Sequence, residues 1–596
     1  MCAIFGIIGA YEEADAHDAF RTLVHRGRDA SYYLADETSF LGIHRLSITN
    51  TAFAFEHLHV HQGIRILFNG EIYNYQLLAQ ELGLEVCSEM EVLYASYAKW
   101  GDDFVKELRG MFAIAVIEEA QIKLFRDPFG KKPLFYTQHN HRFIFASESK
   151  AIHRLVPFSF DRKIIPQYLS FGATLSTQTF DPHICQVDAG ECVTFDVASQ
   201  EITTVAYHQF LKKSQRISDA KEAERVLEKV LLDSVSLRLP SEVPFACLLS
   251  GGLDSSLIAA MASTQQPIHT FSIGYEGYEK YDERPFARRV SEHISSRHHE
   301  VVFDKAAFLE TIDEVMVLLD EPLADPAMLP LYHLMKAVHK EGFKVVLTGD
   351  GSDELFIGYR TYKEFYALEH LGALKYKGWG EHYLKAHFSM HKEWEWHKRA
   401  FEGSMLFRSS AEVFTDLQQN RLLRMNIKDN TSATMLEPYR TVFEQRGFAS
   451  PVDWYSFLDL KVMLEAVFLR KLDRMSMAHS IEARSPFMDK EVVNLAFSCA
   501  PELRMTDTSK GLVKSIALRY LPEEIVLRKK KGFNYPYMQW LQESQELEVI
   551  NRVQEKMQLF EEEELTMYLQ KAKQGKFAHH LFSLYMLCKW IEHKIL

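Results

Sequence analysis

The chain has 596 residues, of which 47% are hydrophobic and 25% charged, a balance that is typical of soluble globular proteins and excludes a disordered or fibrous chain. The formal net charge of −13 argues against a nucleic-acid partner, because a phosphate backbone is bound by an excess of Lys and Arg. The length exceeds one compact core and predicts roughly two to four domains.

Cysteine use and hydropathy indicate the compartment. The seven cysteines are scattered, odd in number and without a CxxC pair, so neither a disulfide framework nor a zinc knuckle is indicated. The apolar run 3–10 has no basic segment before it and is too short to span a bilayer, which predicts a strand and not a signal peptide. No later segment reaches membrane-spanning length without charges. We therefore expect a cytoplasmic protein with no membrane partner.

Short apolar runs separated by Asn, Gly, Asp and Pro turns dominate the first part of the chain and predict a sheet-rich domain over residues 1–205. Examples of these runs are residues 65–68, 113–117 and 143–146. A polar stretch at 211–216 precedes a predicted helix whose apolar positions are Val226, Val230, Leu231, Val235 and Leu237. We place the domain boundary near residue 210 and a second domain over residues 211–596.

The second predicted domain opens with strand-like runs that alternate with helical stretches. These runs cover residues 245–249, 269–273 and 344–347. The alternation is typical of a parallel sheet wrapped by helices, so we expect an α/β domain. From 360 to 470 the chain becomes aromatic and His-rich without strand signals, and from 490 to 596 the pattern is mostly helical.

The first candidate for chemistry is Cys2. A small residue at position 2 is the situation in which the initiator Met is usually removed, and Cys2 would then be the N-terminus. Its α-amine would titrate near pH ~8 and can activate the thiol for attack on an amide carbonyl. Taken alone, a Met-Cys start more often begins a buried strand. The segment 69–74 adds donors for an oxyanion, the Asn69 amide and the Gly70 backbone N–H.

A glutamine substrate also needs its carboxylate and ammonium bound, which suits Arg45 on one side and Glu71 and Glu89 on the other. Each of these alone is more often an ordinary surface or turn residue. Together they resemble the class II glutamine amidotransferase domain, whose fold is an α+β N-terminal-nucleophile sandwich (αββα). The matching segments are 1–6, 25–29, 45–48, 69–74, 110–113, 126–127 and 146–148. Arg28 stands where that family usually has Pro, and Glu89 stands where it has Asp, which adds a methylene.

A second constellation follows the predicted strand 245–249. The string Ser250-Gly251-Gly252-Leu253-Asp254-Ser255-Ser256 leads into a helical segment. Glycines let backbone N–H groups approach phosphate, serine hydroxyls donate further bonds, and a helix N-terminus favours the anion. A bare Ser-Gly-Gly would more often be a capped helix start. The full string is no Walker A loop, and it resembles the pyrophosphate loop of the N-type ATP pyrophosphatases, which cleave ATP to AMP and pyrophosphate.

A second acidic loop, residues 347–356, follows another predicted strand and should reach the same edge of the sheet. Two carboxylate clusters at one nucleotide indicate bound Mg²⁺, although such a loop alone could equally be an exposed turn. Cationic segments follow at 471–477, 484–489, Lys510 and 528–533. They either neutralise triphosphate and pyrophosphate or form solvated helix faces with weak ion pairs.

The order of these strings, from residue 243 to about 541, resembles the synthetase domain of glutamine-hydrolysing asparagine synthetases. The resemblance implies an α/β parallel-sheet ATP pyrophosphatase domain with a helical C-terminal part. It implies that Lys510 stabilises charge around the pentavalent or pyrophosphate species, and that Asp350 assists ammonia attack on an acyl-adenylate. It also implies a Mg²⁺ site at Asp254 and Asp353. The implied ATP contacts are Leu249, Ser250, Gly251, Gly252, Asp254, Ser255, Ser256, Ile273, Thr348 and Gly349.

Three residues of the acidic loop depart from that family's pattern. Asp350 stands where Glu is usual, Thr348 where Ser is usual, and Ile357 where Gly is usual. Asp350 keeps the carboxylate but shortens its reach. These departures bear on the identity of the acceptor more than on the chemistry.

The two resemblances predict a ligase that converts aspartate, glutamine, ATP and water to asparagine, glutamate, AMP and pyrophosphate through a β-aspartyl-adenylate. One alternative is amidation of another carboxylate, such as a sugar acid. Another is a non-catalytic binding or storage protein, against which intact Cys2, Asn69, Asp254 and Asp353 weigh. The predicted partners are glutamine, ATP with Mg²⁺, and aspartate, and the resemblance implies a homodimer. A water-poor ammonia channel between the two sites is also expected.

Overall fold

The fold was analysed in a computed structural model of the chain. It describes residues 2–49, 58, 60–85, 88–208, 216–369, 371, 378–380, 382–383, 392–423, 431–529, 531–532 and 534–596. Most of the polar stretch on which the boundary near residue 210 was placed lies outside these residues, as do Lys530 and Phe533 of the basic segment. Within the described part of the chain, every helix is too short or too polar to cross a bilayer.

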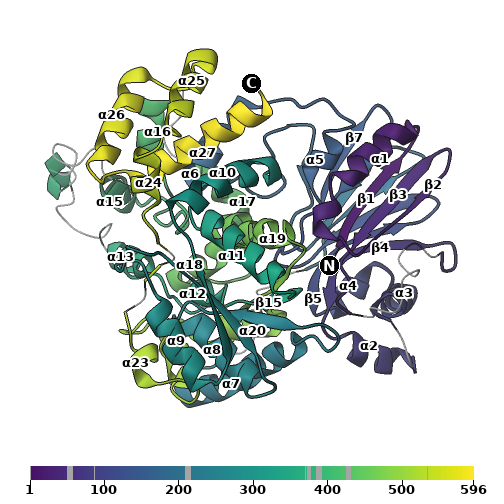
Figure 1. The fold of residues 1–596 in the computed structure, drawn as a ribbon, viewed down its shortest axis with the longest axis horizontal. Helices are drawn as coiled ribbons and strands as arrows, with labels where there is room; N and C mark the ends of the chain where they lie inside the picture. Colours follow the sequence, from purple (N-terminus) through teal and green to yellow (C-terminus); the bar gives the residue numbers. More distant parts are fainter. Residues whose placement is uncertain are drawn as a thin grey trace.

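Residues 2–206 form two antiparallel sheets (Figure 1). The first sheet has the order β2 (Ala30–Ala35), β3 (Ser39–Arg45), β1 (Cys2–Ile8), β8 (Arg142–Ala146), β7 (Phe135–His139) and β9 (Cys185–Gln186). The second has the order β11 (Ile202–Ala206), β10 (Glu191–Asp196), β6 (Gln121–Arg126), β5 (Gly110–Ile117) and β4 (Arg65–Ile72). The apolar runs predicted as strands are therefore strands.

Alternation along the strands builds four layers. Ile4 on β1 and Leu67 on β4 share one core between the two sheets, whereas Phe5 packs on the opposite face of its sheet with residues of α1 (Glu13–Arg21) and α5 (Ser149–Ile152). Phe68 packs outward with residues of α2 (Tyr75–Leu82) and α3 (Glu89–Trp100). This helix–sheet–sheet–helix order confirms the predicted αββα sandwich.

The second part contains a parallel sheet with the order β14 (Arg297–Val302), β13 (His269–Gly274), β12 (Phe245–Leu248), β15 (Val345–Leu347) and β16 (Glu482–Arg484). All four strand pairs are parallel, as expected for an α/β domain. Helix α7 (Ala220–Leu237) precedes β12, and the helices between β12 and β15 are α8 (Leu253–Ser263), α9 (Arg284–His293), α10 (Lys305–Leu318) and α11 (Met328–Lys340). The two edge strands, β14 and β16, were not predicted.

The rest of the described chain is mostly helical, as predicted for the C-terminal part. The helices after β15 are α12 (Ser352–Leu355), α13 (Arg360–Leu368), α15 (Lys392–Glu402), α16 (Asp416–Leu422), α17 (Thr431–Gln445), α18 (Pro451–Asp459), η6 (Leu460–Leu469) and α19 (Arg470–Met477). After β16 follow α20 (Lys490–Ser498), α21 (Pro501–Arg504), α22 (Gly511–Ala517), α23 (Glu523–Val526), α24 (Tyr537–Gln542), α25 (Glu548–Met557), α26 (Glu562–Lys573) and α27 (Ala578–Lys594).

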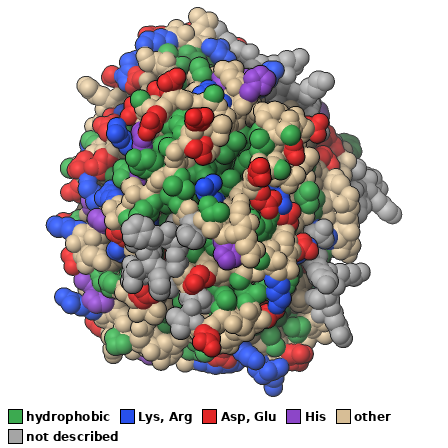
Figure 2. Space-filling model, turned by 90° about the vertical axis from the view of Figure 1, so that its right-hand side faces the viewer, with side chains coloured by type: hydrophobic (Ala, Val, Ile, Leu, Met, Phe, Trp, Pro, Cys, Tyr) green, Lys and Arg blue, Asp and Glu red, His purple; other side chains and the backbone are tan. Residues whose placement is uncertain are grey.

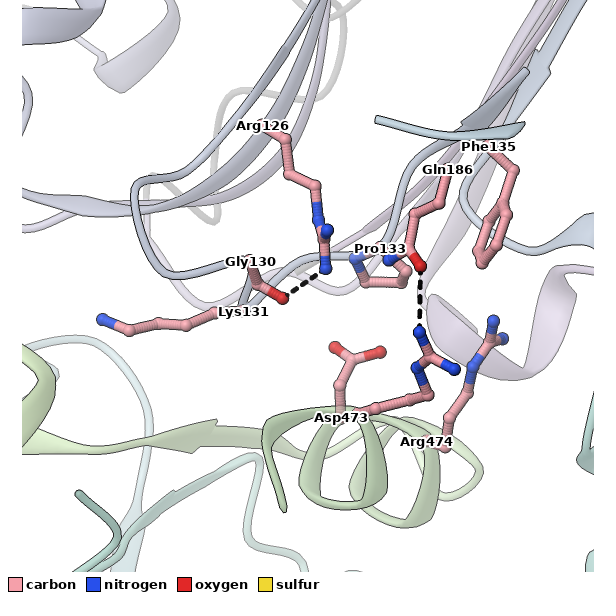
Figure 3. A pocket seen from close by; sticks show the side chains of 9 residues that line it. Arg126, Gly130, Lys131, Pro133, Phe135, Gln186, Asp473 and Arg474 are labelled. Carbon is pink, nitrogen blue, oxygen red and sulfur yellow. Dashed lines mark hydrogen bonds between the residues drawn. The ribbon is translucent and has the colours of Figure 1, made fainter. Parts of the chain in front are cut away.

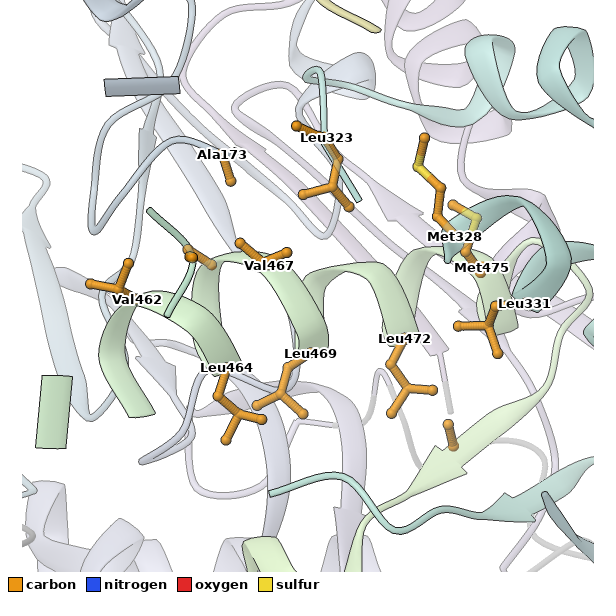
Figure 4. Packing of buried hydrophobic residues seen from close by; sticks show 14 of the residues in the cluster. Ala173, Leu323, Met328, Leu331, Val462, Leu464, Val467, Leu469, Leu472 and Met475 are labelled. Atoms are coloured by element: carbon orange, nitrogen blue, oxygen red, sulfur yellow. The ribbon is translucent and has the colours of Figure 1, made fainter. Parts of the chain in front are cut away.

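The helix formed by η6 and α19 is buried on more than one side. Figure 4 shows Val467 directed toward Ala173 and Leu323, whereas Leu464, Leu469 and Leu472 point to the opposite side of the same helix. Apolar side chains on both of these sides are buried, as are the charged Asp473 and Arg474 on α19. This helix therefore forms part of the junction between the two halves of the molecule.

Buried charges cross the same junction. Arg26, which precedes β2, donates to Glu148 at 2.8 Å and to Asp473 on α19 at 2.8 and 3.0 Å. Arg474 on α19 contacts Glu148 at 2.6 Å and Asp320 at 2.8 Å. On the outer face of the molecule, by contrast, Figure 2 shows acidic and basic side chains interspersed with apolar ones. The two halves are thus joined by ion pairs in the interior.

We expect that the Arg26→Met variant will be destabilised by about 3–5 kcal/mol, because two buried carboxylates lose a shared cation. The change should appear as a lower urea midpoint of unfolding. The matched control is Arg21→Met, whose side chain is 75% exposed in its pair with Asp18 and which should leave the midpoint unchanged. Equal midpoints for both variants would contradict this account of the junction.

Candidate functional site

Cys2 lies at the start of β1 and is almost fully buried. Its backbone nitrogen donates to Oδ1 of Asn69 on β4 at 3.1 Å, so removal of Met1 would leave the new amine against this amide. Burial raises the pKa of the Cys2 thiol, and the charge of the chain's amino terminus is the largest opposing cause. The structure therefore brings together a nucleophile candidate and its predicted donor.

Gly70 follows Asn69 at a point where two strands approach closely. A Cβ atom at this position would lie 2.0 Å from the carbonyl oxygen of Met111 on the paired strand β5. Only glycine fits this backbone without displacing β5. Ser147, which was not predicted, completes the surroundings: its hydroxyl accepts from the backbone N–H of Ile4 at 2.9 Å and lies 3.5 Å from Nδ2 of Asn69.

The three predicted glutamine-binding side chains lie close to Cys2 along neighbouring strands. Arg45 is the direct β3 partner of Cys2. Glu89, at the start of α3, accepts from the backbone N–H of Ile72. Burial raises the pKa of Glu89 well above its usual range, and the charge of Glu71 adds to this shift. The charges of the two carboxylates therefore influence each other.

The pyrophosphate-loop candidate follows β12 and leads into α8, as predicted. Gly251 has φ +69°, and a Cβ there would lie 2.6 Å from the backbone nitrogen of Ala287, so the turn requires glycine. The hydroxyls of Ser250 and Ser255 lie 3.0 Å apart across the loop. Arg528 donates to the carbonyl oxygen of Gly251 at 2.7 Å, which places one residue of the C-terminal basic segment beside this loop.

The acidic loop after β15 lies beside the first loop, because β12 and β15 are adjacent parallel strands. A Cβ at Gly349 would lie 2.7 Å from the backbone nitrogen of Ser255. Leu249 and Ile273 are buried at the carboxyl ends of β12 and β13. The predicted nucleotide contacts thus gather at one end of the sheet.

Lys510 connects the two loops. Its ammonium lies 2.6 Å from Asp254 and 2.7 Å from Asp353. The two aspartates raise the pKa of Lys510 against the opposing effect of burial, so it is charged. A place where two carboxylates converge on one cation suits a divalent ion that is also bound by phosphate oxygens. The described residues contain no cluster of three or more protein ligands that could hold a metal alone.

Asp350 and Thr348 occupy the same loop. Burial is the main cause that raises the pKa of Asp350, and a hydrogen bond from Thr348 and the charge of Lys471 oppose it. The hydroxyl of Thr348 also lies 2.9 Å from that of Ser485. A buried carboxylate with a raised pKa is a better proton acceptor than an ordinary aspartate.

Two arginines of the other cationic segments have carboxylate partners away from the two loops. Arg474 belongs to the junction network with Glu148 and Asp320. Arg484 lies 3.2 Å from Glu71 at the glutamine candidate site. The sequence pattern could not distinguish an arginine in a buried ion pair from an arginine that binds phosphate, because both occur in segments of similar composition.

A small cavity lies at the junction between the two halves. Its lining includes Arg126, Lys131 and Gln186 from the first half and Asp473 and Arg474 from α19 (Figure 3). Lys131 donates to the carbonyl oxygen of Met488 at 2.7 Å, and burial lowers the pKa of Lys131 to about 7.

The Gly70→Ala variant should be destabilised by about 1–3 kcal/mol, because the added methyl group pushes β4 from β5. Thermal unfolding would measure the loss as a lower midpoint. Gly378→Ala is the matched control, since a Cβ at Gly378 would meet nothing within 4 Å. If Gly70→Ala unfolds at the wild-type temperature, β4 and β5 are less tightly constrained than this geometry requires.

Comparison with known proteins agrees with both halves. The asparagine synthase family model matches residues 226–592, and the glutamine amidotransferase domain model matches residues 1–208. Asparagine synthetase [glutamine-hydrolyzing] 1 of Bacillus subtilis is 30% identical and covers 93% of this chain and 90% of its own. Asparagine synthetase B of Escherichia coli is 31% identical and covers 60% of this chain and 65% of its own. With matches that extend through both halves, the chain belongs to the asparagine synthase family.

Proposed function

We propose that the chain is a glutamine-hydrolysing asparagine synthetase that forms asparagine from aspartate with ATP as the energy source. In this proposal residues 1–205 hydrolyse glutamine and residues 211–596 activate aspartate. The observation that carries it is the presence of two complete clusters in one chain, Cys2 with Asn69 and Lys510 with its two aspartates. We further propose a homodimer in the cytoplasm, on the basis of the family resemblance.

In the first half, the Cys2 thiol attacks the glutamine amide carbon. The N-terminal amine accepts the thiol proton and passes it to the departing nitrogen, which releases ammonia and leaves a γ-glutamyl thioester. Asn69 and the Gly70 N–H stabilise the oxyanion. Water then hydrolyses the thioester to glutamate. Arg45 holds the α-carboxylate of glutamine, and Glu71 and Glu89 hold its ammonium.

In the second half, the aspartate side-chain carboxylate attacks the α-phosphorus of ATP and displaces pyrophosphate. The backbone of the 250–256 loop binds the phosphates, and Lys510 stabilises the charge that develops on the departing pyrophosphate. Ammonia then attacks the acyl-adenylate carbonyl and displaces AMP. Asp350 accepts the proton that the new nitrogen must lose, which is consistent with its raised pKa.

Asp254 and Asp353 are the side chains that would hold Mg²⁺. The fit is supported by Oδ1 of Asp254, which is buried without a hydrogen-bond partner, and by the convergence of both carboxylates on one cation. When bound, Mg²⁺ would neutralise phosphate charge and orient the triphosphate.

The assay that tests the proposal uses purified protein with Mg-ATP and glutamine labelled with ¹⁵N in the amide, with and without aspartate. Labelled asparagine, AMP and pyrophosphate that appear only with aspartate would support it. Glutamate and ammonia without asparagine would show a working first half and a different acceptor carboxylate, such as that of a sugar acid. No hydrolysis of glutamine would reject the assignment of Cys2.

Replacement of Cys2 by Ala should abolish glutamine-dependent synthesis, because no nucleophile remains to release ammonia. Synthesis with added ammonium should stay within about twofold of wild type, since the second half does not use the thiol. Production of asparagine from each nitrogen source would be measured in parallel. Loss of both activities in a folded variant would contradict the two-site scheme.

Replacement of Lys510 by Gln should slow ATP-dependent pyrophosphate release by a factor on the order of 10²–10³, the usual cost of losing one preorganised charge. Glutamine hydrolysis in the same variant serves as the internal control and should persist. A variant that releases pyrophosphate at the wild-type rate would exclude Lys510 from the reaction.

A further inference from the structure

An ion pair between the two halves reaches the glutamine candidate site. Nη2 of Arg484, on β16, is 3.2 Å from Oε1 of Glu71, on β4. The hydroxyl of Thr49 donates to the same oxygen at 2.5 Å. Arg484 is 1% exposed and Glu71 is 6% exposed. A carboxylate predicted to bind substrate is thus held by a cation from the other half of the chain.

The guanidinium of Arg484 is fixed on several sides. Its Nε donates to Glu482 at 2.5 Å, and its Nη1 donates to the backbone carbonyl of Arg238 at 2.8 Å. Its Cζ lies 5.3 Å from the centre of the Tyr73 ring. A planar guanidinium that is hydrogen-bonded through Nε and Nη1 and packed on an aromatic ring has a fixed orientation, which a flexible lysine would lack. The position of Arg484 therefore determines where Glu71 is held.

We propose that Arg484 is a positioning residue for glutamine, which holds the Glu71 carboxylate in place and ionised for the α-ammonium of the substrate. This inference rests on the proposed function, because it takes Glu71 as a ligand of that ammonium. Arg484 and Thr49 both contact Oε1 of Glu71. The other carboxylate oxygen of Glu71, Oε2, takes part in neither contact. The glutamine site would then be complete only with the ATP-dependent half docked against it.

The electrostatics of Glu71 support this role. Burial raises the pKa of Glu71, and Arg484 is the largest opposing cause. Loss of Arg484 would therefore raise this pKa further, and a protonated carboxyl group binds an ammonium weakly. The other charged or titratable groups that face Glu71 are Glu482 on β16, Glu89 on α3, the amino terminus, Tyr73 and Tyr75.

The test is the hydrolysis of glutamine by the Arg484→Lys variant of the full chain in the absence of ATP. The KM for glutamine should rise roughly tenfold or more, as expected when the geometry of a buried ion pair is lost. The kcat should change much less, because the contact serves binding and not the chemical step. In the Arg484→Gln variant, which also removes the positive charge, the acidic limb of kcat/KM should move to higher pH, which a purely structural role would not produce.

A second variant keeps the test decisive if Arg484→Lys does not fold. The double variant E482Q/R484Q removes both charges of the Glu482–Arg484 pair, so no unpaired charge remains on β16. It should show the same rise in the KM for glutamine. Arg109→Gln is the matched control, since Arg109 also bridges the halves, to Asp489 at 3.1 Å, and should leave the KM unchanged. Ammonium-dependent synthesis reports that each variant is folded.

The outcomes separate the two claims. A folded Arg484 variant with an unchanged KM and an unmoved acidic limb would overturn the role of Arg484 while leaving the proposed function intact. A wild-type protein that does not hydrolyse glutamine would instead overturn the proposed function, and this inference with it.

Discussion

The arrangement of this molecule depends on buried arginines that find their carboxylates across the junction between its halves. Arg26 meets Asp473, and Arg484 meets Glu71. A buried guanidinium that lacks a carboxylate partner is costly. The two halves are therefore stable together only in the arrangement that brings both arginines to their carboxylates. The buried helix η6–α19 supplies contact area at the same junction. Charge pairing therefore fixes how the Cys2 site is placed relative to the Lys510 site.

The short strand β16 belongs to both sites. The side chain of Arg484 faces Glu71, while its backbone carbonyl accepts from the N–H of Thr348 at 2.9 Å. The next residue, Ser485, lies within hydrogen-bond distance of the Thr348 hydroxyl. One residue thus contacts the glutamine site through its side chain and the acidic loop through its backbone. A displacement of this strand cannot alter one site without altering the other.

The sequence could predict members of the two candidate sites because each candidate site contains a contiguous string. Asn69-Gly70-Glu71 lies at the end of one apolar strand, and the 250–256 loop joins an apolar strand to a helix, so local patterns contain the information. The strand β16 was not predicted, and Arg484 was singled out only as part of a cationic segment, for the opposite reason. A three-residue strand that carries Glu482 and Arg484 has no apolar run to reveal it, and the partner of Arg484 is distant in the chain. Motif matches could therefore predict the members of each site but not the contact that joins them.

Two residues at the acidic site have a strained backbone. Lys510 has φ 59° and Ile357 has φ 56°, a left-handed conformation that costs a non-glycine residue on the order of 1–3 kcal/mol. Between their side chains and Asp353 lies Gly358, where a Cβ would be 2.3 Å from Cε of Lys510. The conformation of Lys510 directs its ammonium to both aspartates, and that interaction offsets part of the strain. Because the strained backbone and the paired charges coincide, the ammonium is held in place before any phosphate arrives, which is the condition for electrostatic preorganisation.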